Sequence, residues 1–376
     1  MYSEEFYGKI KLIRDAVKFQ KTDKVPNVSN FFTWKVYDSQ YTYKEAYYNF
    51  DIMKDVVIQF HKRYNFDAYI DFGTRNLFNF VDALGGGVHK LNEETGAINV
   101  VDDPYIFPEE YPAFAENPEE FMRVCFARKY PGMTTERFLN AVKEFFAFGQ
   151  YSASIEGVMA QQCERPALYS MNSVFSAPIE ILQNGIRGLK GLSLDIRRNK
   201  AQLKEALEGY WEKATVGPLE AALKADNANA CTDLFCSFTA QGLLSVKQFE
   251  ELYWPHLKYA IDRIVAEDKT MIIFVENEVL RFADFFQDIP KGHILMFHEM
   301  DDIFEMRRRM PNIALAGGMS TDLLGYASPE QCVTWAKKLI TELGEGYLVS
   351  QNKMISFAND CKRENLLAVN EFVNSY

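Results

Sequence analysis

Four short apolar runs in the C-terminal third of the chain each end on polar or glycine residues. The runs are residues 271–275, 294–297, 313–316 and 347–349. Continuous short apolar runs are typical of strands that are buried on both faces, and such strands belong to parallel sheets. Helical spacers separate the runs, so the pattern predicts strands and helices in alternation. Polar residues follow the carboxyl end of each strand, which is where the catalytic side chains of a parallel barrel are expected.

The first two thirds of the chain continue this alternation. Four more strands are predicted, at residues 25–34, 66–72, 167–175 and 228–238. Helices are predicted between them, including one near 134–148 and another near 154–162. With no repeat or linker to divide it, the chain predicts one α/β domain over residues 1–376, a (β/α)8 TIM barrel, preceded by a helix within residues 1–20. Residues 85–132, which are rich in proline, glutamate and aromatic residues from 104 onward, are predicted to be an insertion that lies over the barrel as a lid.

Composition narrows the class of protein. The 48% of hydrophobic residues is enough for a large core, and the net charge of -11 argues against a nucleic-acid partner. Six scattered cysteines show no zinc or redox spacing, so we expect a reduced, cytoplasmic chain. The first 17 residues contain no unbroken apolar segment, so neither a signal peptide nor a membrane span is expected.

A series of motifs in a fixed order resembles one family. The motifs are Glu110-Tyr111-Pro112, Asn117-Pro118-Glu119-Glu120-Phe121, Ile186-Arg187-Gly188-Leu189-Lys190-Gly191, Gln248-Phe249-Glu250-Glu251-Leu252-Tyr253-Trp254-Pro255 and Gly317-Gly318-Met319-Ser320. Together they resemble the uroporphyrinogen decarboxylase superfamily over most of the chain from residue 20. This resemblance implies a uroporphyrinogen decarboxylase-like barrel. It also implies either decarboxylation or methyl transfer to a corrinoid that a separate small protein carries.

The decarboxylase interpretation fits poorly. The family holds its eight-carboxylate substrate partly through an arginine-rich segment after the first strand, whereas residues 27–34 contain no arginine. The family's essential aspartate after the second strand falls at Thr74. Carboxylates buried without partners would each cost several kcal/mol. The methyltransferase branch, which includes O-demethylating enzymes, is therefore favoured.

The zinc motif of the thiol-specific methyltransferases is replaced in this chain. Their His-x-Cys at the end of the fifth strand corresponds to Phe274-Val275-Glu276, and the later cysteine region to Ser350-Gln351-Asn352. The resemblance then implies an oxygen-rich site in which Glu276, His298 and Asp233 are the catalytic residues and the zinc ligands. Alternatives remain open: Glu276 and His298 could form a hydrogen-bonded pair or donate a proton, and Asp233 could cap the next helix.

Further side chains at or near strand ends are candidates for substrate binding. They are Phe31, Phe32, Trp34, Tyr169, Phe235 and Asn352. The aromatic residues among them are either pocket walls or core.

The function expected from these observations is a corrinoid-dependent methyltransferase of an anaerobic O-demethylation system. It would move a methyl group from a small aryl methyl ether to the cobalt of a corrinoid protein. A decarboxylating lyase that acts on a smaller acid is the first alternative, and a basic anchor in the pocket would favour it. A non-catalytic ligand-binding barrel is the second. The number of subunits is left open, with a homodimer as the candidate assembly.

Overall fold

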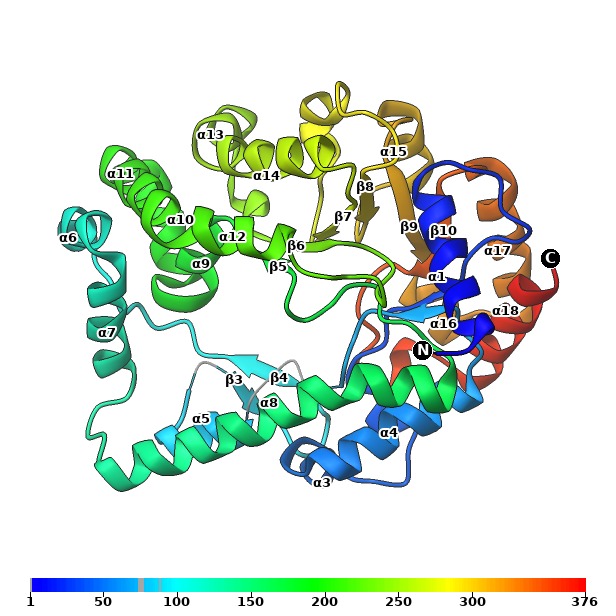
Figure 1. The fold of residues 1–376 in the computed structure, drawn as a ribbon, viewed down its shortest axis with the longest axis horizontal. Helices are drawn as coiled ribbons and strands as arrows, with labels where there is room; N and C mark the ends of the chain where they lie inside the picture. The colour runs from blue at the N-terminus through cyan, green and yellow to red at the C-terminus, as the bar shows by residue number, and fades with distance from the viewer. Residues whose placement is uncertain (1, 74–77, 88) are drawn as a thin grey trace.

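The predicted barrel of parallel strands is confirmed. The structure, a computed structural model, describes residues 2–73, 78–87 and 89–376. Strands β5 to β10 form a parallel sheet in the order β10-β9-β8-β7-β6-β5, and β1 pairs with β2, also in parallel (Figure 1). Isolated parallel bridges join Asn27 to Val349, Tyr69 to Ala167 and Ala167 to Ala230. These bridges connect the β1-β2 pair to both sides of the larger sheet, so the wall closes on itself.

The four C-terminal strands agree with the apolar runs, whereas the four strands before them are shorter than predicted. The strand bounds are β1 Val28–Ser29, β2 Ala68–Tyr69, β5 Val174–Phe175, β6 Leu234–Phe238, β7 Met271–Val275, β8 Ile294–Phe297, β9 Ala314–Met319 and β10 Tyr347–Gln351. The carboxyl ends of these strands lie at one end of the barrel, which we call the mouth.

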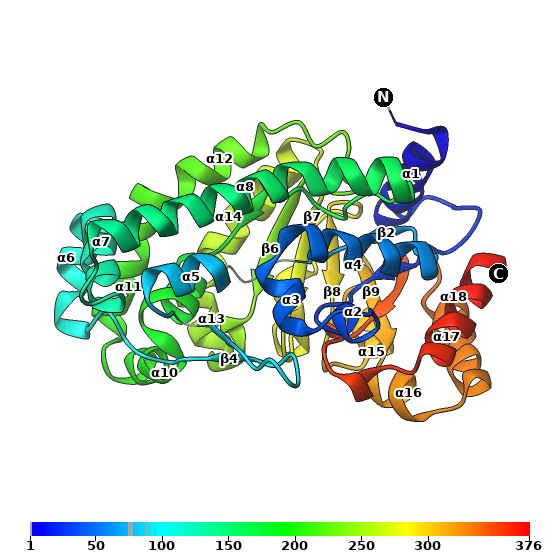
Figure 2. The same ribbon diagram turned by 90° about the horizontal axis from the view of Figure 1, so that it is seen from below.

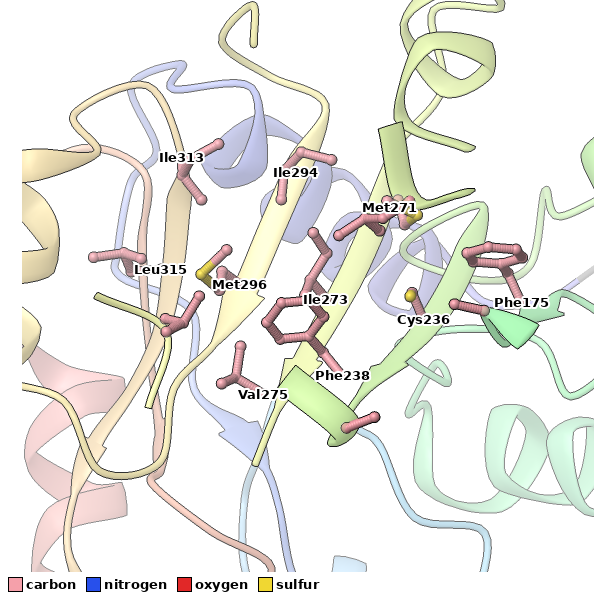
Figure 3. Close-up of a cluster of buried hydrophobic side chains, with 14 of the residues drawn as sticks. Phe175, Cys236, Phe238, Met271, Ile273, Val275, Ile294, Met296, Ile313 and Leu315 are labelled. Atoms are coloured by element: carbon pink, nitrogen blue, oxygen red, sulfur yellow. The ribbon is translucent and has the colours of Figure 1, made fainter. Parts of the chain in front are cut away.

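Side chains of the C-terminal strands alternate between two apolar environments. Ile273, Met296 and Leu315 belong to a large cluster that includes residues of the surrounding helices, and Figure 3 shows these strand residues. Their neighbours Ile272 and Leu295 belong to a second cluster. Because one face of each strand is covered by helices, the second set lies on the face toward the barrel lumen.

Helices surround the wall, and some of them belong to residues 85–132. The helices before β5 are α1 Glu4–Val17, α2 Trp34–Tyr37, α3 Tyr43–Tyr48, α4 Phe50–Arg63, α5 Phe78–Leu84, η1 Pro108–Glu110, α6 Tyr111–Glu116, α7 Pro118–Lys129 and α8 Thr135–Cys163. The helices between β5 and β7 are α9 Pro178–Ile181, η2 Leu182–Ile186, α10 Gly188–Arg198, α11 Lys200–Tyr210, η3 Trp211–Thr215, α12 Val216–Leu223, η4 Ala240–Leu243, α13 Val246–Leu252 and α14 Trp254–Ala266. The last are η5 Leu280–Phe286, α15 Ile303–Arg309, α16 Thr321–Tyr326, α17 Pro329–Leu343, η6 Ala358–Asp360 and α18 Arg363–Ser375. Among the described residues, no helix is both long and apolar enough to cross a membrane.

The two helices predicted near 134–148 and 154–162 are one continuous helix, α8, of 29 residues. Gly149 lies between the two predicted segments, and glycine disfavours a helix. Tertiary contact outweighs this preference: Tyr151 is buried, and its hydroxyl donates to the carbonyl oxygen of Phe72 at 2.6 Å. The helix therefore continues from the insertion to the barrel wall (Figure 2).

The N-terminal helix α1 packs at the end of the barrel opposite the mouth. Arg14 donates to the carbonyl oxygens of Asn227 and Ala230, which precede β6. Residues 85–132, the predicted insertion, contain the antiparallel strands β3 His89–Leu91 and β4 Ile98–Val100, followed by α6 and α7. Its role as a lid stays a prediction.

Candidate active site at the barrel mouth

Glu276 stands at the mouth of the barrel, directly after β7. Its N–H donates to the carbonyl oxygen of Phe238 at 3.0 Å, and its own carbonyl accepts from the side-chain amide of Gln241. Alternation along the strand places Glu276 on the lumen side with Phe274. The half-buried Glu276 carboxyl group is therefore held at the mouth by backbone contacts to the loop after β6.

A cleft of about 510 Å³ lies beside this carboxyl group. Its lining includes Glu276, Asn277, Gln183, Thr239, Arg281 and Met300. The size is within the range of small-molecule sites, roughly 300–1,000 Å³. The loops after β6, β7 and β8 all contribute, as expected for the catalytic end of a parallel barrel.

Arg281 gives this cleft a positive charge. Its Nη2 donates to the carbonyl oxygens of Gln241 at 2.8 Å and Gly242 at 3.1 Å. Within residues 2–73, 78–87 and 89–376, no carboxylate forms an ion pair with it. The guanidinium group has donors beyond those two bonds, so it can hold an anionic group of a ligand.

A row of aromatic rings lies along the lumen face of neighbouring strands below Glu276. The ring of Tyr169 stacks on Phe235 with centroids 4.3 Å apart, and Phe235 lies 5.9 Å from Phe274. Phe274 in turn lies 5.6 Å from Phe297 on the next strand. Glu276 is two residues after Phe274 on the same face, so the row forms an apolar floor below the carboxyl group. Tyr169 and Phe235, two of the predicted substrate residues, belong to this row, and their role in substrate binding stays a prediction.

A buried carboxylate fixes the loop that supports Glu276. Glu180 accepts hydrogen bonds from the N–H groups of Thr239 at 2.8 Å and Ala240 at 2.9 Å and from the Tyr253 hydroxyl at 2.7 Å. Burial raises the pKa of Glu180. This anchor determines where the loop after β6 begins, and hence where Gln241 meets Glu276. Nothing in the sequence marked Glu180, because its partners come from distant segments.

His298, which was expected to share a site with Glu276, lies elsewhere. It follows Met296 on the helix-facing side of β8, and its ring packs on Gly317. A Cβ built on Gly317 would lie 2.5 Å from Cδ2 and 2.7 Å from Nε2 of the imidazole. Burial lowers the pKa of His298 to about 4, although the backbone of Asp301 acts in the opposite direction. Neither ring nitrogen has a hydrogen bond of ordinary geometry to any part of the chain that the structure describes. His298 is therefore a neutral, buried packing residue.

Asp233, the third expected ligand, lies at the wrong end of the barrel. It precedes β6 rather than following it, and its Oδ2 accepts from the N–H of Thr270 at 2.9 Å and from the Thr270 hydroxyl at 3.0 Å. These contacts tie the amino ends of β6 and β7 together. Glu276, His298 and Asp233 thus do not converge, and the described residues contain no group of three or more His, Cys, Asp or Glu side chains suited to a metal. This donor set does not fit zinc.

Phe31 and Trp34 are core residues rather than pocket walls. Both are fully buried, with ring centroids 5.2 Å apart, and the Trp34 indole donates to the carbonyl oxygen of Cys361 at 3.1 Å. Phe32 points away from them, with its ring 6.5 Å from that of Tyr47. The expectation of an aromatic substrate wall from Phe31 and Trp34 is therefore corrected.

Asn352 is the last of the candidate residues and lies at the mouth. Its Oδ1 accepts from the N–H of Gly318 at 2.7 Å, and its own N–H donates to the carbonyl oxygen of Met319 at 3.1 Å. It joins the carboxyl ends of β9 and β10. Thr74, where the family's aspartate was expected, lies outside the described residues.

A buried ion pair that no sequence pattern indicated follows the first two strands. The Lys35 ammonium group contacts the Asp71 carboxylate and the carbonyl oxygen of Phe31, and both charged side chains are about 2% exposed. Asp71 also accepts from the N–H of Gly73 at 3.1 Å. Asp71 lies inside the predicted strand 66–72, whereas β2 ends at Tyr69, so the predicted strand end came too late to mark Asp71 as a residue of the mouth.

A closed parallel barrel with a polar cleft at the carboxyl ends of its strands defines a TIM barrel. The model of the uroporphyrinogen decarboxylase (URO-D) family matches residues 168–376, more than half of the chain. The chain belongs to this family. No curated protein matches the sequence.

Comparison with solved structures supports the same fold. A methyltransferase from Methanosarcina mazei superposes with a TM-score of 0.66 and 14% identity, over 98% of both chains. At this identity the likeness shows the fold alone. A structure of proline utilization A (PutA) with proline bound in remote sites has a TM-score of 0.31 and 14% identity, over 99% of this chain and 38% of the other, and carries no argument.

Proposed function

We propose that the protein is a methyltransferase that moves a methyl group from a small aryl methyl ether to the cobalt of a corrinoid held by a separate protein. One observation carries the proposal: Glu276 lines an open cleft, and two residues before it on the same face of β7 lies Phe274, one of a row of aromatic rings. The shared fold with a methyltransferase, over 98% of both chains, also supports it. Such a site offers an acid and a flat apolar surface to the same ligand.

The chemistry of ether cleavage accounts for the acid. An alkoxide or phenolate is a poor leaving group unless its oxygen gains a proton as the C–O bond breaks. In the proposed reaction, Glu276 donates its proton to the ether oxygen and the substrate leaves as a phenol. The aryl ring rests on Phe274 and Phe235. The corrinoid, when its carrier protein docks at the mouth, supplies the nucleophilic metal that accepts the methyl group.

Uroporphyrinogen itself is a poor candidate substrate. Residues 27–34 provide no arginine, and Phe31 and Trp34 of this segment are fully buried in the core. Eight carboxylates would find too few cations there, and each unpaired charge would cost several kcal/mol.

One substrate can test the proposal against its main alternative. A decarboxylating lyase that acts on a smaller acid is favoured by Arg281, because a cation in the cleft can hold a carboxylate. We therefore suggest incubating the purified protein with 4-hydroxy-3-methoxybenzoate and reduced cobalamin as the methyl acceptor. Methyl transfer yields methylcobalamin and 3,4-dihydroxybenzoate, whereas decarboxylation yields carbon dioxide and 2-methoxyphenol. Formation of methylcobalamin supports the proposal. Carbon dioxide release without methylcobalamin would replace it with the lyase.

A further inference from the structure

A second hollow, of about 490 Å³, lies outside the Glu276 cleft and shares no lining residue with it. Helix α7, helix α5, the segment at Tyr105 and the turn of η2 at Gly185 surround it. Most of its walls are apolar. They include Phe80, Tyr105, Met122, Phe126, Tyr130 and Ile186. Four of these six side chains are aromatic, so the hollow is suited to a flat ring.

Lys129 places one positive charge in this apolar hollow. Its ammonium nitrogen lies 5.7 Å from the ring centroid of Tyr105 and 5.8 Å from that of Tyr130. Burial lowers the pKa of Lys129. In the described ranges, with residues 74–77 and 88 set aside, no carboxylate pairs with it. A half-buried cation without a counter-charge is costly, and a ligand anion would offset that cost.

The neighbouring cations differ from Lys129 in this respect. Arg128 forms an ion pair with Glu110 at 2.6 Å, and Arg123 pairs with Glu119 and Glu120. Their charges are already compensated by this chain. The requirement for an external anion therefore falls on Lys129.

We propose that this hollow binds a flat aromatic carboxylate, with the ring against the aromatic walls and the carboxylate paired with Lys129. Aromatic rings favour contact with other rings, and a charge-assisted hydrogen bond to Lys129 fixes the orientation. The site is separate from Glu276, so it stands whether or not the methyl-transfer proposal is correct.

Gly185 allows the hollow to be closed without distorting the fold. A Cβ built on this residue has no heavy atom within 4 Å, so a larger side chain there meets open space. Because Gly185 lines the hollow, Gly185→Leu adds a bulky side chain at its wall. Gly8→Leu is the matched control, because Gly8 is also helical, also has no heavy atom within 4 Å of a built Cβ, and lies in α1 at the opposite end of the barrel.

Isothermal titration of the full chain with 2-naphthoate tests the proposal directly. We expect saturable binding that Lys129→Met weakens about tenfold or more, the effect of losing a charge-assisted hydrogen bond. Gly185→Leu should weaken binding by a similar factor, and Gly8→Leu should leave it unchanged. Absence of binding, or equal binding by the Gly185→Leu and Gly8→Leu variants, would overturn the site.

Two further ligands test the chemical class. The neutral 2-naphthamide keeps the ring and removes the charge, and octanoate keeps the charge and removes the ring. Both should bind at least tenfold more weakly than 2-naphthoate. Equal binding of the amide would refute the role of Lys129, and equal binding of octanoate would refute the choice of an aromatic ligand. Thermal unfolding of each variant verifies that the protein used for titration is folded.

Discussion

Glu276 and His298 follow neighbouring strands, yet their side chains lie on opposite sides of the barrel wall. The register of β7 and β8 pairs Phe274 with Phe297, which places Glu276 level with Glu299 rather than with His298. Because successive side chains alternate, an offset of one residue turns His298 toward the helices. The acid at the mouth is therefore independent of the histidine, and the two residues should respond differently to substitution.

Replacement of Glu276 should remove activity and leave the fold intact. Glu276→Gln preserves shape but removes the transferable proton, so methyl transfer should fall by about 100-fold, as expected for loss of a general acid. The measurements are methylcobalamin formation and the thermal unfolding midpoint. Glu345→Gln is the control, since Glu345 is exposed and precedes β10 at the opposite end of the barrel. Near-normal methyl transfer by Glu276→Gln would place the chemistry elsewhere at the mouth.

His298 should make the free energy of unfolding decrease as the pH falls. Its folded pKa is about 4 against an ordinary value of 6.5, so between these values the unfolded chain binds a proton that the folded protein does not. Stability contributed by neutral His298 is thus present above pH 6.5 and is lost as the pH falls toward 4. Urea unfolding at pH 7, 6 and 5 should show a shallower loss for His298→Asn than for the unchanged protein, by up to about 1.4 kcal/mol per pH unit. Parallel curves for the two proteins would contradict the assignment. His256, with its pKa also lowered to about 4, adds the same trend to both.

Gly317 and His298 should be energetically coupled. Gly317 has φ +132, a conformation that side chains rarely adopt, and a methyl group there would overlap the imidazole. Gly317→Ala should therefore destabilise the protein by about 2 kcal/mol or more. In a His298→Ala background the steric part disappears while the backbone part remains, so the cost should drop by roughly 0.5–3 kcal/mol. Additive costs in this double-mutant cycle would mean that the contact is not a source of strain.

The Lys35–Asp71 pair should be sensitive to removal of one partner. Lys35→Met leaves the Asp71 carboxylate buried without its cation, which costs about 3–5 kcal/mol. Lys35→Met combined with Asp71→Asn should recover part of that loss, because the stranded charge is gone. Chemical denaturation of the two variants measures both effects. Lys353→Met, at an exposed position, should stay within about 0.5 kcal/mol of the unchanged protein.

The sequence predicted the barrel but not which residues face its lumen. Apolar runs such as Met271–Val275 mark a strand because both of its faces are buried. For the same reason these runs lack a polar and apolar alternation that would tell the lumen face from the helix face. Glu276 and His298 consequently looked equivalent, and only the register of β7 with β8 separates them.

Two other differences have equally local causes. Asp233 was placed within the predicted strand 228–238, whereas β6 starts at Leu234, so Asp233 precedes the strand. Boundaries are the weakest part of a sequence-based assignment. Phe31 and Trp34 were candidate pocket walls because an aromatic residue near a strand end looks the same in a core and in a pocket. Phe31 and Trp34 contact each other, and Trp34 contacts Cys361, which lies far along the chain; these contacts identify both aromatic residues as core residues.

The barrel wall is hydrogen-bonded unevenly around its circumference. Strand β7 is paired with β6 over five residues and with β8 over four, whereas β1 and β2 are paired over two, and Ala167 joins its neighbours through isolated bridges. Backbone amides near β1, β2 and Ala167 have fewer neighbouring ladder bonds to break before they exchange with deuterium. Residues 85–132 leave the wall between β2 and Ala167, so they join the barrel on the side where the strand pairing is shortest. The backbone amides of β7, which supports Glu276, should therefore exchange with deuterium more slowly than those of β1 and β2.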